Sequence, residues 1–431
     1  MATVGALAIA GLTLLPSGSG AEQTSPLCVI CGPAGGVDFT LNLLLYVPFG
    51  AGLGAMALRW RNAAGVVFIV SLGIELLQIG VISGRDASLG DLVANTLGGI
   101  IGIWIGSRWR SLAYPSAARS LRLARSWGVL WLVTVAVAVW ASGIDIPEPP
   151  WWAQLALKGN SPETFRGSVL QTRIGGIGVS RDSLVNAPAL GAALRDGAEA
   201  SVVAVIPGPT PAPSAVFAIV DSNETEVFAL GQDARDGVFH VQTRASAMLA
   251  LRNPSVRLPG AFASGPGDTV RLTGRRTRSS LRITAERRGS RVTRTLQVSP
   301  QWAWTFFLPF EYSLSPSSWR IMVFWIAALI FPLGYWVGRA CCLDRRAAGL
   351  GSCGLLAGVA VAGLGALPIL GGLHIAALIE WDAWVAGVAF GAMAGWLSVP
   401  RTQRRSLLSF TQPRVLSSPV SPSWRQSEDL L

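Results

Sequence analysis

The sequence has few of the residues on which most enzyme active sites depend. Its 431 residues include only two histidines, His240 and His374, and five cysteines. Two histidines give little material for a metal site or a proton relay, and they argue against a Ser/His/Asp triad. The cysteines are too few and too scattered for a disulfide framework. We therefore assign no catalytic residue, no metal and no cofactor, and we favour a protein that is not an enzyme.

Charged residues are also scarce. Asp, Glu, Lys and Arg make up 14% of the sequence, against roughly 25% in soluble domains, and hydrophobic residues reach 51%. Lys158 is the only lysine, so arginine supplies almost all of the positive charge behind the net value of +11. This composition indicates that lipid is the main solvent of the chain. The length indicates a folded insert beside the membrane part.

Hydrophobic runs long enough to cross about 30 Å of hydrocarbon recur along the chain. They lie at 38–58, 63–82, 89–106, 127–143, 318–338, 347–371 and 378–398. A shorter run, 2–15, is either a retained helix or a signal peptide, because a small-residue cleavage site follows it but a basic region does not precede it. The sequence therefore predicts an α-helical polytopic bundle of about eight transmembrane helices.

Arginines in the short loops orient this bundle. They gather in loops that share one side if every run crosses, and the positive-inside rule makes that side the cytoplasm. The residues are Arg59, Arg61, Arg108, Arg110, Arg119, Arg122, Arg125, Arg339, Arg345, Arg346, Arg401, Arg404 and Arg405. We predict a multi-pass protein of the cytoplasmic (inner) membrane, with residues 144–317 extracytoplasmic.

The segment 144–317 has a different pattern from the membrane runs. Short stretches of β character, separated by turns, lie at 201–206, 215–220, 226–230, 238–243, 269–273, 280–286 and 291–298. Leu281, Ile283 and Ala285 alternate with polar residues, and this period of two is typical of a half-buried strand. Many short strands with turns between them predict an all-β sandwich.

Polar residues inside the first membrane runs are the main candidates for a site, because burying them in lipid costs free energy. Glu75 and Gln78 follow Ser71 on one helix face, and Asp91 and Asn95 share a face of the next run. Asn42, Pro48 and Gly50 belong to 38–58, Arg85 lies in the short loop 83–88, and Gly98, Gly102 and Gly106 form a small-residue surface for helix packing. The predicted topology brings these polar groups together near the outer leaflet. They form either a salt-bridge knot, with Arg85 neutralising Asp91 or Glu75, or a cleft for a polar headgroup, and the two are compatible.

At these residues the sequence resembles the VanZ-like family. The matching text runs from Asn42-Leu-Leu-Leu-Tyr-Val-Pro48-Phe-Gly50 through Ser71-Leu-Gly-Ile-Glu75-Leu-Leu-Gln78 to Asp91-Leu-Val-Ala-Asn95-Thr-Leu-Gly98, and covers about residues 1–106. The resemblance implies a membrane location and the phenotype that names the family, low-level teicoplanin resistance. It does not imply a reaction.

The insert is similar to the concanavalin A-like/laminin G-type sandwiches that accompany some VanZ-like domains. It lacks the Glu-x-Asp-x-x-Glu pattern of laminarinase-like relatives, so glycoside hydrolysis by paired carboxylates is not expected. One stretch of the insert is dense in arginine, and we predict an anion-binding surface there, with a solvated basic face as the alternative. The candidates are Arg275, Arg276, Arg278, Arg287 and Arg288.

These patterns divide the chain into five regions. They are a four-helix membrane domain (1–106), a basic loop and fifth helix (107–143), the β domain (144–317), three further helices (318–398) and a disordered cytoplasmic tail (399–431). The three further helices are either unrelated to the first region or a degenerate repeat of it. In the repeat, Pro332 and Gly334 match Pro48 and Gly50, and Asp382 with Gly387, Gly391 and Gly395 matches Asp91 with its glycines.

We expect a non-enzymatic envelope protein. The residues Asn42, Glu75, Gln78, Arg85, Asp91 and Asn95 would bind an amphiphilic or lipid-linked ligand at the outer leaflet. Its partners would be membrane lipids and a glycan or an anionic cell-wall polymer, and no nucleic acid. The alternatives are a lipid or small-molecule transporter, against which the apolar inner halves of the runs argue, and an intramembrane enzyme acting on a lipid with Glu75 as general base.

Overall fold

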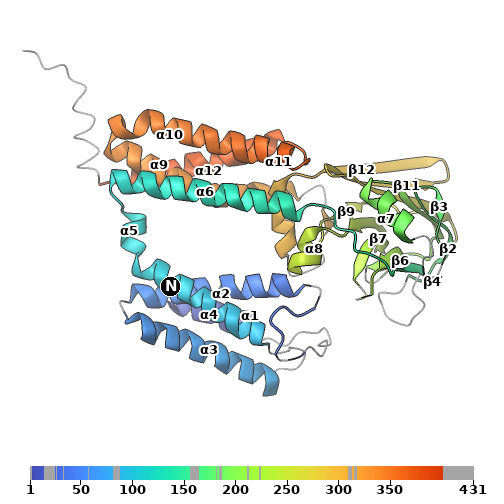
Figure 1. The fold of residues 1–431 in the computed structure, drawn as a ribbon, viewed down its shortest axis with the longest axis horizontal. Helices are drawn as coiled ribbons and strands as arrows, with labels where there is room; N and C mark the ends of the chain where they lie inside the picture. The colour runs from blue at the N-terminus through green and yellow to red at the C-terminus, as the bar shows by residue number, and fades with distance from the viewer. Residues whose placement is uncertain are drawn as a thin grey trace, which may run out of the picture.

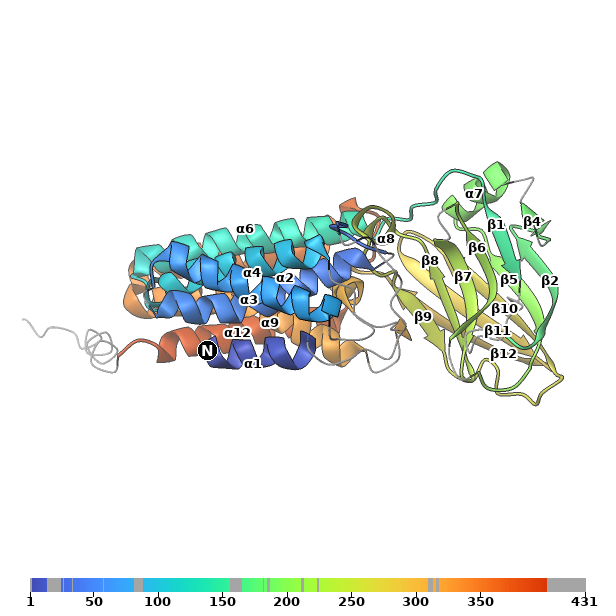
Figure 2. The ribbon, with the colours of Figure 1, turned by 90° about the horizontal axis from the view of Figure 1, so that it is seen from below.

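A computed structural model shows a bundle of helices along the long axis of the molecule and a β sandwich at one end of it (Figures 1 and 2). The structure describes residues 2–13, 25, 27–32, 34–56, 58–80, 88–155, 165–180, 182–183, 187–210, 213–222, 225–308, 313–314 and 318–400. Arg85 and the tail 401–431 therefore lie outside the described residues.

Six helical stretches in the described part are long and apolar enough to cross a membrane. They are α2 (Gly35–Ala55), α3 (Trp60–Gly80), α4 (Leu89–Ser107), α6 (Ala117–Ala141), α9 (Trp319–Leu343) and α10 (Arg345–Ala360), the last of which continues through a π-helical turn (Val361–Ala366) into α11 (Leu367–Leu370). Two further helices, α1 (Ala2–Thr13) and α12 (Leu378–Leu397), pack on α2 and α9. The chain is thus a multi-pass membrane protein with the helical bundle that the sequence predicts.

The helices differ from the predicted runs in two places. α6 begins at Ala117, whereas the apolar run begins at residue 127, because the first turns of the helix carry arginines whose long side chains can reach water. The run 347–371 is interrupted by its π-helical turn. Gly363 in this turn faces the ring of Trp131, and a Cβ at Gly363 would lie 2.0 Å from that ring. Close packing of an aromatic side chain therefore accompanies the irregular turn.

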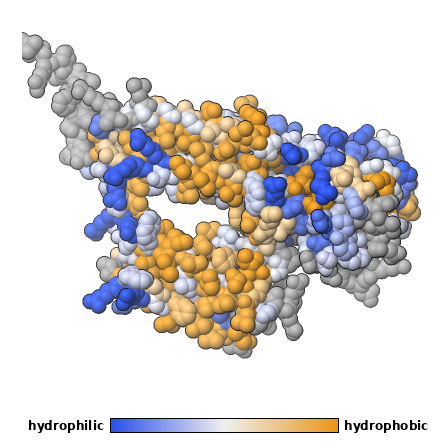
Figure 3. Space-filling model, in the orientation of Figure 1, coloured by the Kyte–Doolittle hydropathy of each residue, from blue (hydrophilic) through white to orange (hydrophobic). Residues whose placement is uncertain are grey.

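The helices form two groups that are linked at their ends. α1–α4 form one group and α6 with α9–α12 form the other, and α5 (Trp109–Ala113) connects them (Figure 1). Each group has its own apolar core. The space-filling view shows an open gap between the groups, bordered by apolar surface on both sides, and hydrophilic residues at the end of the bundle remote from the sandwich (Figure 3).

The two groups meet beside the β domain. The short helix α8 (Arg244–Leu249) and the 3-10 helix η1 (Pro300–Phe307) lie at this junction. An apolar cluster joins Val37 of α2 and Ala141 of α6 to Ala245 and Phe306. The Gly36 N–H also donates a hydrogen bond to the Ala250 carbonyl at 3.1 Å. The start of α2 and the end of α6 are thus held by segments that belong to the β domain.

The β domain consists of two sheets packed face to face. One sheet has the strand order β13-β9-β8-β7-β6-β1-β4 and the other β12-β11-β10-β5-β2-β3, and described neighbours are antiparallel except β13 with β9. The strands of the first sheet are β1 (Trp152–Leu155), β4 (Asp182–Ser183), β6 (Ser214–Val220), β7 (Glu226–Asp233), β8 (Asp236–Val241), β9 (Ser255–Leu258) and β13 (Ser313–Leu314). Those of the second are β2 (Ser168–Ile174), β3 (Ile177–Gly178), β5 (Ala200–Val205), β10 (Thr269–Arg276), β11 (Ser280–Arg287) and β12 (Ser290–Gln297).

The prediction of an all-β sandwich is confirmed, and the structure adds the strands β1, β2, β3, β4, β9 and β13 and the helical segments α7, α8 and η1, which the sequence did not predict. Each of the seven predicted strands is present, as β5, β6, β7, β8, β10, β11 and β12. The helix α7 (Ala187–Arg195) packs Leu190 and Leu194 into the core of the sandwich, and the sequence analysis did not identify it. Its residues are small and apolar, so their helical periodicity is hard to separate from loop composition.

Candidate functional site

The polar residues of α2, α3 and α4 meet at the end of the first group that faces the β domain. The Asn42 amide donates a hydrogen bond to Asp91 Oδ1 at 2.5 Å, which joins α2 to α4. The Asn95 amide donates to Ser71 Oγ at 3.1 Å, which joins α4 to α3. Helical spacing alone places Ser71 with Glu75, and Asp91 with Asn95, on shared faces. We call Asn42, Tyr46, Ser71, Glu75, Asp91 and Asn95 the outer polar cluster, after the side of the membrane that the loop arginines predict for it.

Glu75 lies against the N-terminus of α4. It is 6% exposed, and its Oε2 accepts a hydrogen bond from the Ser88 N–H at 3.3 Å. Ser88 is the N-cap of α4, and its hydroxyl accepts a hydrogen bond from the Asp91 N–H at 3.0 Å. The free N–H groups and the positive end of the helix dipole stabilise a carboxylate at such a position. The start of α4 therefore helps to hold two acidic side chains close together.

Gln78 makes a separate contact among the described residues. The Gln78 amide donates to the Thr13 carbonyl at 3.2 Å, so it ties α3 to α1. Arg85 lies outside the described residues, and the predicted pairing of Arg85 with Asp91 or Glu75 stays a prediction.

Tyr46 is the member of the cluster that the sequence analysis quoted without assigning a role. It is fully buried beside Ser71, Glu75 and Asp91. Its hydroxyl lies beside Ser71 without a hydrogen bond of standard geometry among the described residues, and Asn95 Oδ1 has no partner there. The signal in the sequence was the position of Tyr46 four residues after Asn42, on the same face of α2. Two buried polar atoms without a hydrogen bond of standard geometry mark the place where a ligand could bind.

Glycines bring α2 and α4 close enough to form the cluster. A Cβ at Gly98 would lie 2.0 Å from the Leu43 carbonyl oxygen, and one at Gly102 would lie 2.2 Å from that of Val47. Gly50 and Gly106 approach the partner helix just as closely, at 2.1 and 2.0 Å from carbonyl oxygens of Gly99 and Ala51. Pro48 lies within α2 between these contacts. The helix-packing residues predicted from the sequence thus line the α2–α4 interface.

Residues 4–110 match the VanZ/LLP1 family model. The N-terminal region is VanZ-like. This region contains α1–α4 and the whole outer polar cluster, so the resemblance found in the sequence is confirmed for this part of the chain. No curated protein and no solved structure shows significant similarity to the chain.

The five arginines proposed for anion binding do not form one surface. Arg276 is 5% exposed, and burial lowers its pKa to about 10. Its guanidinium donates to the carbonyl of Ser142, the C-cap of α6, at 3.0 Å. Arg287 donates to the Gly260 carbonyl at 2.8 Å, Arg288 forms an ion pair with Asp268, and Arg278 packs against Gly372. Strand alternation sends neighbouring arginines to opposite faces, which a count along the sequence does not show.

Arg275 lies in a surface pocket on the outer face of the six-stranded sheet. The pocket has a volume of about 480 Å³, and Arg173, Arg271, Ser201 and Thr273 also line it. Thr273 is paired with Ser201, and Ser201 with Arg173, so one row of the sheet crosses the pocket floor. Arg271 and Arg275 flank Thr273 on β10. We call Arg173, Arg271 and Arg275 the arginine pocket.

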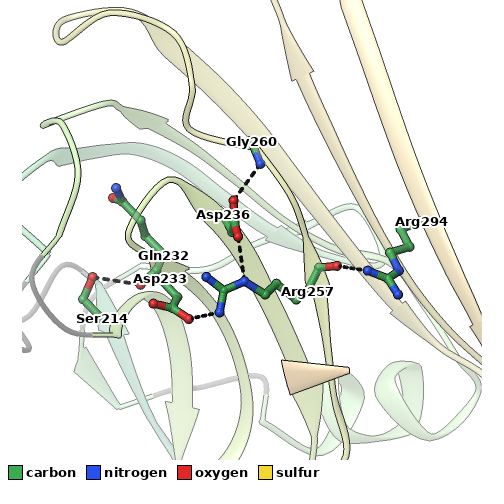
Figure 4. Close-up of polar contacts among 7 residues, drawn as sticks. All are labelled: Ser214, Gln232, Asp233, Asp236, Arg257, Gly260 and Arg294. Carbon is green, nitrogen blue, oxygen red and sulfur yellow. Dashed lines mark hydrogen bonds and ion pairs between the residues drawn. The ribbon is translucent and has the colours of Figure 1, made fainter. Parts of the chain in front are cut away.

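Another arginine of the β domain is held in an ion-pair network. Arg257 Nε donates to Asp236 at 2.6 Å, and its Nη1 pairs with Asp233 (Figure 4). Arg294 of β12 donates to the Arg257 carbonyl at 2.9 Å (Figure 4). This network ties the seven-stranded sheet to the six-stranded one. It gives these arginines a structural role and separates them from the arginine pocket.

The described residues contain no group of three or more His, Cys, Asp or Glu side chains that could hold a metal ion. Cys28 and Cys31 form a disulfide, in the segment whose Cys28 carbonyl accepts a hydrogen bond from the Gly90 N–H at 3.1 Å. The loop between α1 and α2 therefore covers the start of α4, next to Asp91.

Proposed function

We propose that the outer polar cluster binds the polar headgroup of an amphiphilic or lipid-linked ligand at the outer leaflet, without chemical turnover. The observation that carries this proposal is the pair of carboxylates, Glu75 and Asp91, beside the Tyr46 hydroxyl and the Asn95 oxygen, which form no hydrogen bond of standard geometry with the described residues. Such atoms cost free energy when they are left unsatisfied away from water, and a ligand that satisfies them recovers it.

The chemistry of the cluster favours a ligand rich in hydrogen-bond donors. A carboxylate only accepts hydrogen bonds, and each can accept about four. Asn42 and the Ser88 N–H supply one donor each. Because carboxylate oxygens accept hydrogen bonds, hydroxyl or ammonium groups of a headgroup fit this site better than a quaternary amine, which has no donor.

The location at the outer leaflet rests on three observations. The cluster lies at the end of the bundle next to the β domain. Arg108 and Arg110, which belong to the arginines that predict the cytoplasmic side, follow the opposite end of α4, and Figure 3 shows hydrophilic surface at the end of the bundle remote from the sandwich. The Cys28–Cys31 disulfide at the cluster end fits an oxidising compartment. These observations support an extracytoplasmic β domain.

The decisive test is teicoplanin susceptibility of a deletion strain that carries wild type, Glu75→Gln or Thr96→Val. Thr96 follows Asn95, but its hydroxyl donates to the Leu92 carbonyl of its own helix, so Thr96→Val is the matched control. We expect Glu75→Gln to lose protection at normal membrane abundance and Thr96→Val to keep it. Full protection by Glu75→Gln would rule out a role for the charged group.

A lipid-transport activity is the competing outcome at the same site. The open gap between the helical groups offers lipid a side entrance in Figure 3. Proteoliposomes with labelled lipid separate the two functions, because a binder leaves the label in its original leaflet whereas a transporter moves it. Transport that Glu75→Gln abolishes would replace binding as the function.

We infer a second binding function for the β domain, namely that the arginine pocket holds an anionic cell-wall polymer. Arg271 and Arg275 are exposed on one strand, and Arg275 lies directly opposite Arg282 of β11. Like charges directly opposite each other destabilise a sheet. An anion in the pocket would accept charge-assisted hydrogen bonds from Arg271 and Arg275, where Arg275 Nε already donates to the Gly197 carbonyl at 2.8 Å and Arg271 lies opposite Glu286. Glu199 at the rim offsets only part of the positive charge.

The polymer proposal is tested with the purified full chain in lipid nanodiscs and a phosphate-bearing polymer, with neutral dextran as control. We expect the triple substitution of Arg173, Arg271 and Arg275 by Gln to abolish retention of the polymer. Arg288→Gln removes an exposed charge outside the pocket, and this variant should still retain the polymer. Equal loss in both variants would indicate a general charge effect and no site.

A further inference from the structure

The helix pair α9–α12 repeats the contacts of the pair α2–α4. In the first pair, glycines four residues apart on α4 face carbonyl oxygens of α2. In the second pair, glycines four residues apart on α12 face carbonyl oxygens of α9. The distances from a Cβ at each glycine are Gly98 to Leu43 2.0 Å, Gly102 to Val47 2.2 Å, Gly106 to Ala51 2.0 Å, Gly387 to Ala327 2.8 Å, Gly391 to Phe331 2.2 Å and Gly395 to Tyr335 2.0 Å.

The two pairs share one register. Adding 284 to a residue number of α2 takes Pro48 to Pro332, and takes each residue whose carbonyl faces a glycine of α4 to the residue of α9 whose carbonyl faces a glycine of α12. Adding 289 takes the three glycines of α4 to the three glycines of α12. The contacts of glycines on the other helix of each pair agree with these shifts. Gly50 of α2 faces the carbonyl of Gly99 on α4, and Gly334 of α9 faces the carbonyl of Val388 on α12. Glycine-rich helices can pack in several registers, so agreement in both directions argues against chance.

The preceding helices extend the correspondence. α1 packs on α2 and α6 packs on α9. Gly5 of α1 lies against Phe49, and a Cβ at Gly128 of α6 would lie 3.9 Å from Leu333, the counterpart of Phe49, with Val359 of α10 closer at 3.0 Å. The β domain then occupies the connection between the first and second helices of the second half, where the first half has the loop that contains Cys28 and Cys31. Each connection covers the start of the last helix of its half. The Cys28 carbonyl accepts a hydrogen bond from the Gly90 N–H of α4, and the Ser299 hydroxyl donates one to Glu380 of α12.

This register changes the residue that corresponds to Asp91. The N-cap of α4 is Ser88 and that of α12 is Ala377, and the shift of 289 takes one to the other. Asp91 and Glu380 are each the third residue after the cap. Asp382, which the sequence pattern suggested, is exposed and lies two residues further on.

We propose that α6, α9 and α12 repeat α1, α2 and α4, and that Glu380 forms a second outer polar site. This site binds the hydroxyl of Ser299, where the chain leaves the β domain, and one further hydrogen-bond donor, a buried water. Glu380 is 2% exposed. Its Oε1 accepts from Ser299 Oγ at 2.8 Å. Its Oε2 has no hydrogen bond of standard geometry among the described residues, and the Ala377 N–H and His374 lie close to the carboxylate. The buried Trp384 N–H, one turn along α12, also has no such hydrogen bond there, so a water molecule near both groups could satisfy them.

The second site differs from the outer polar cluster in what surrounds its carboxylate. The counterparts of Asn42 and Tyr46 are Ile326 and Ile330, and both are fully buried. The counterpart of Asn95 is Trp384. The second half has thus kept one acidic residue and lost the side chains that bind a headgroup in the proposed function. Its role is to hold the end of β12, and with it the β domain, on the second helical group.

The test is a double-mutant cycle on the melting temperature of the full chain in lipid nanodiscs. We expect Ser299→Ala and Glu380→Gln each to lower the Tm by several degrees, and the double variant to lose little more than Glu380→Gln alone. Asp382→Asn should leave the Tm unchanged. Glu380→Asp should lower the Tm only slightly, because Asp91, the counterpart of Glu380, is an aspartate. Fully additive losses, or an equal loss in Asp382→Asn, would overturn the proposal.

A cross-linking experiment keeps the proposal testable if Glu380→Gln fails to fold. Paired cysteines at Ser299 and Glu380, in a chain whose Cys341, Cys342 and Cys353 are replaced by serine, should form a disulfide on mild oxidation. A pair at Ser299 and Asp382 should not. Because neither experiment measures ligand binding, failure here leaves the proposed headgroup site untouched, and loss of that function leaves the repeat untouched.

Discussion

Two acidic side chains between apolar helices, the buried Glu75 and the half-buried Asp91, define the chemistry of the first helical group. Glu75 and Asp91 are held by a helix N-terminus and by an asparagine amide, which satisfy part of their hydrogen-bonding capacity. Helical spacing in the sequence predicted this convergence. The same spacing could not reveal the Ser88 N–H, because a backbone donor leaves no mark in the sequence. Tyr46 was overlooked because a tyrosine in a membrane helix is usually a packing residue.

Tyr46→Phe separates ligand binding from folding at this site. The tyrosine hydroxyl is buried and forms no hydrogen bond of standard geometry with the described residues, so its removal should change the free energy of unfolding by less than about 0.5 kcal/mol. A ligand that uses this hydroxyl loses a hydrogen bond, so protection against teicoplanin should fall. The measurements are Tm and susceptibility, with the exposed Tyr114→Phe as control. A marked loss of Tm in Tyr46→Phe would instead assign the hydroxyl to folding.

The pair Glu226 and His240 gives the β domain an acid-sensitive contact. The two side chains are 2.9 Å apart. Burial opposes ionisation of Glu226, but the hydrogen bond and charge of His240 outweigh it and lower its pKa. A lowered carboxyl pKa contributes stability that is present above the ordinary glutamate range and is lost as the pH falls through the folded-state value. Glu226→Gln should therefore flatten the acid side of the Tm–pH curve, and an unchanged curve would contradict this.

At the scale of helices and strands, close approach and register decide which residues meet. The sequence predicted the membrane runs and seven strands, because hydrophobic length and a period of two are local signals. It could not resolve the arginine stretch of the β domain. Arg275 faces the pocket and Arg276 faces the interior, and this split depends on strand alternation and on which strand lies alongside. The register of α12 against α9 was equally out of reach, and so Asp382 was matched to Asp91.

Gly102→Leu tests the α2–α4 contact. A Cβ at Gly102 would lie 2.2 Å from the Val47 carbonyl, so the helices must separate to admit leucine. Overpacking of this kind costs on the order of 1–3 kcal/mol. We expect a lower Tm and loss of protection, because Asn42 would move away from Asp91. Gly65→Leu on α3 is the control, since a Cβ there meets no atom within 4 Å and the variant should fold normally.

At the scale of the whole molecule, the β domain is fastened to the second helical group by several polar contacts. Arg276 binds the C-terminal carbonyl end of α6, where the helix dipole favours a positive charge. Ser299 binds Glu380, and the His374 N–H donates to the Val298 carbonyl at 3.0 Å. The sandwich is therefore anchored to helix ends as well as connected by the chain.

Cysteine labelling tests the orientation of the whole chain. In a background with Cys341, Cys342 and Cys353 replaced by serine, Ser290→Cys on the β domain should react with a membrane-impermeant maleimide in intact spheroplasts. Arg110→Cys at the opposite end should react only after permeabilisation. Both positions are exposed, so burial does not explain a difference between them. The reverse pattern would place the outer polar cluster at the cytoplasmic leaflet.

The gap between the two helical groups makes the bilayer a structural component of this protein. Its walls are apolar in Figure 3, so acyl chains are the filler that avoids exposing these walls to water. Lipid tails inserted between α1–α4 and the second group would act as a spacer whose thickness and fluidity set the distance between the halves. The separation of the two groups is then a property of protein and membrane together, and it should respond to lateral pressure in a way that a micelle of detergent does not reproduce.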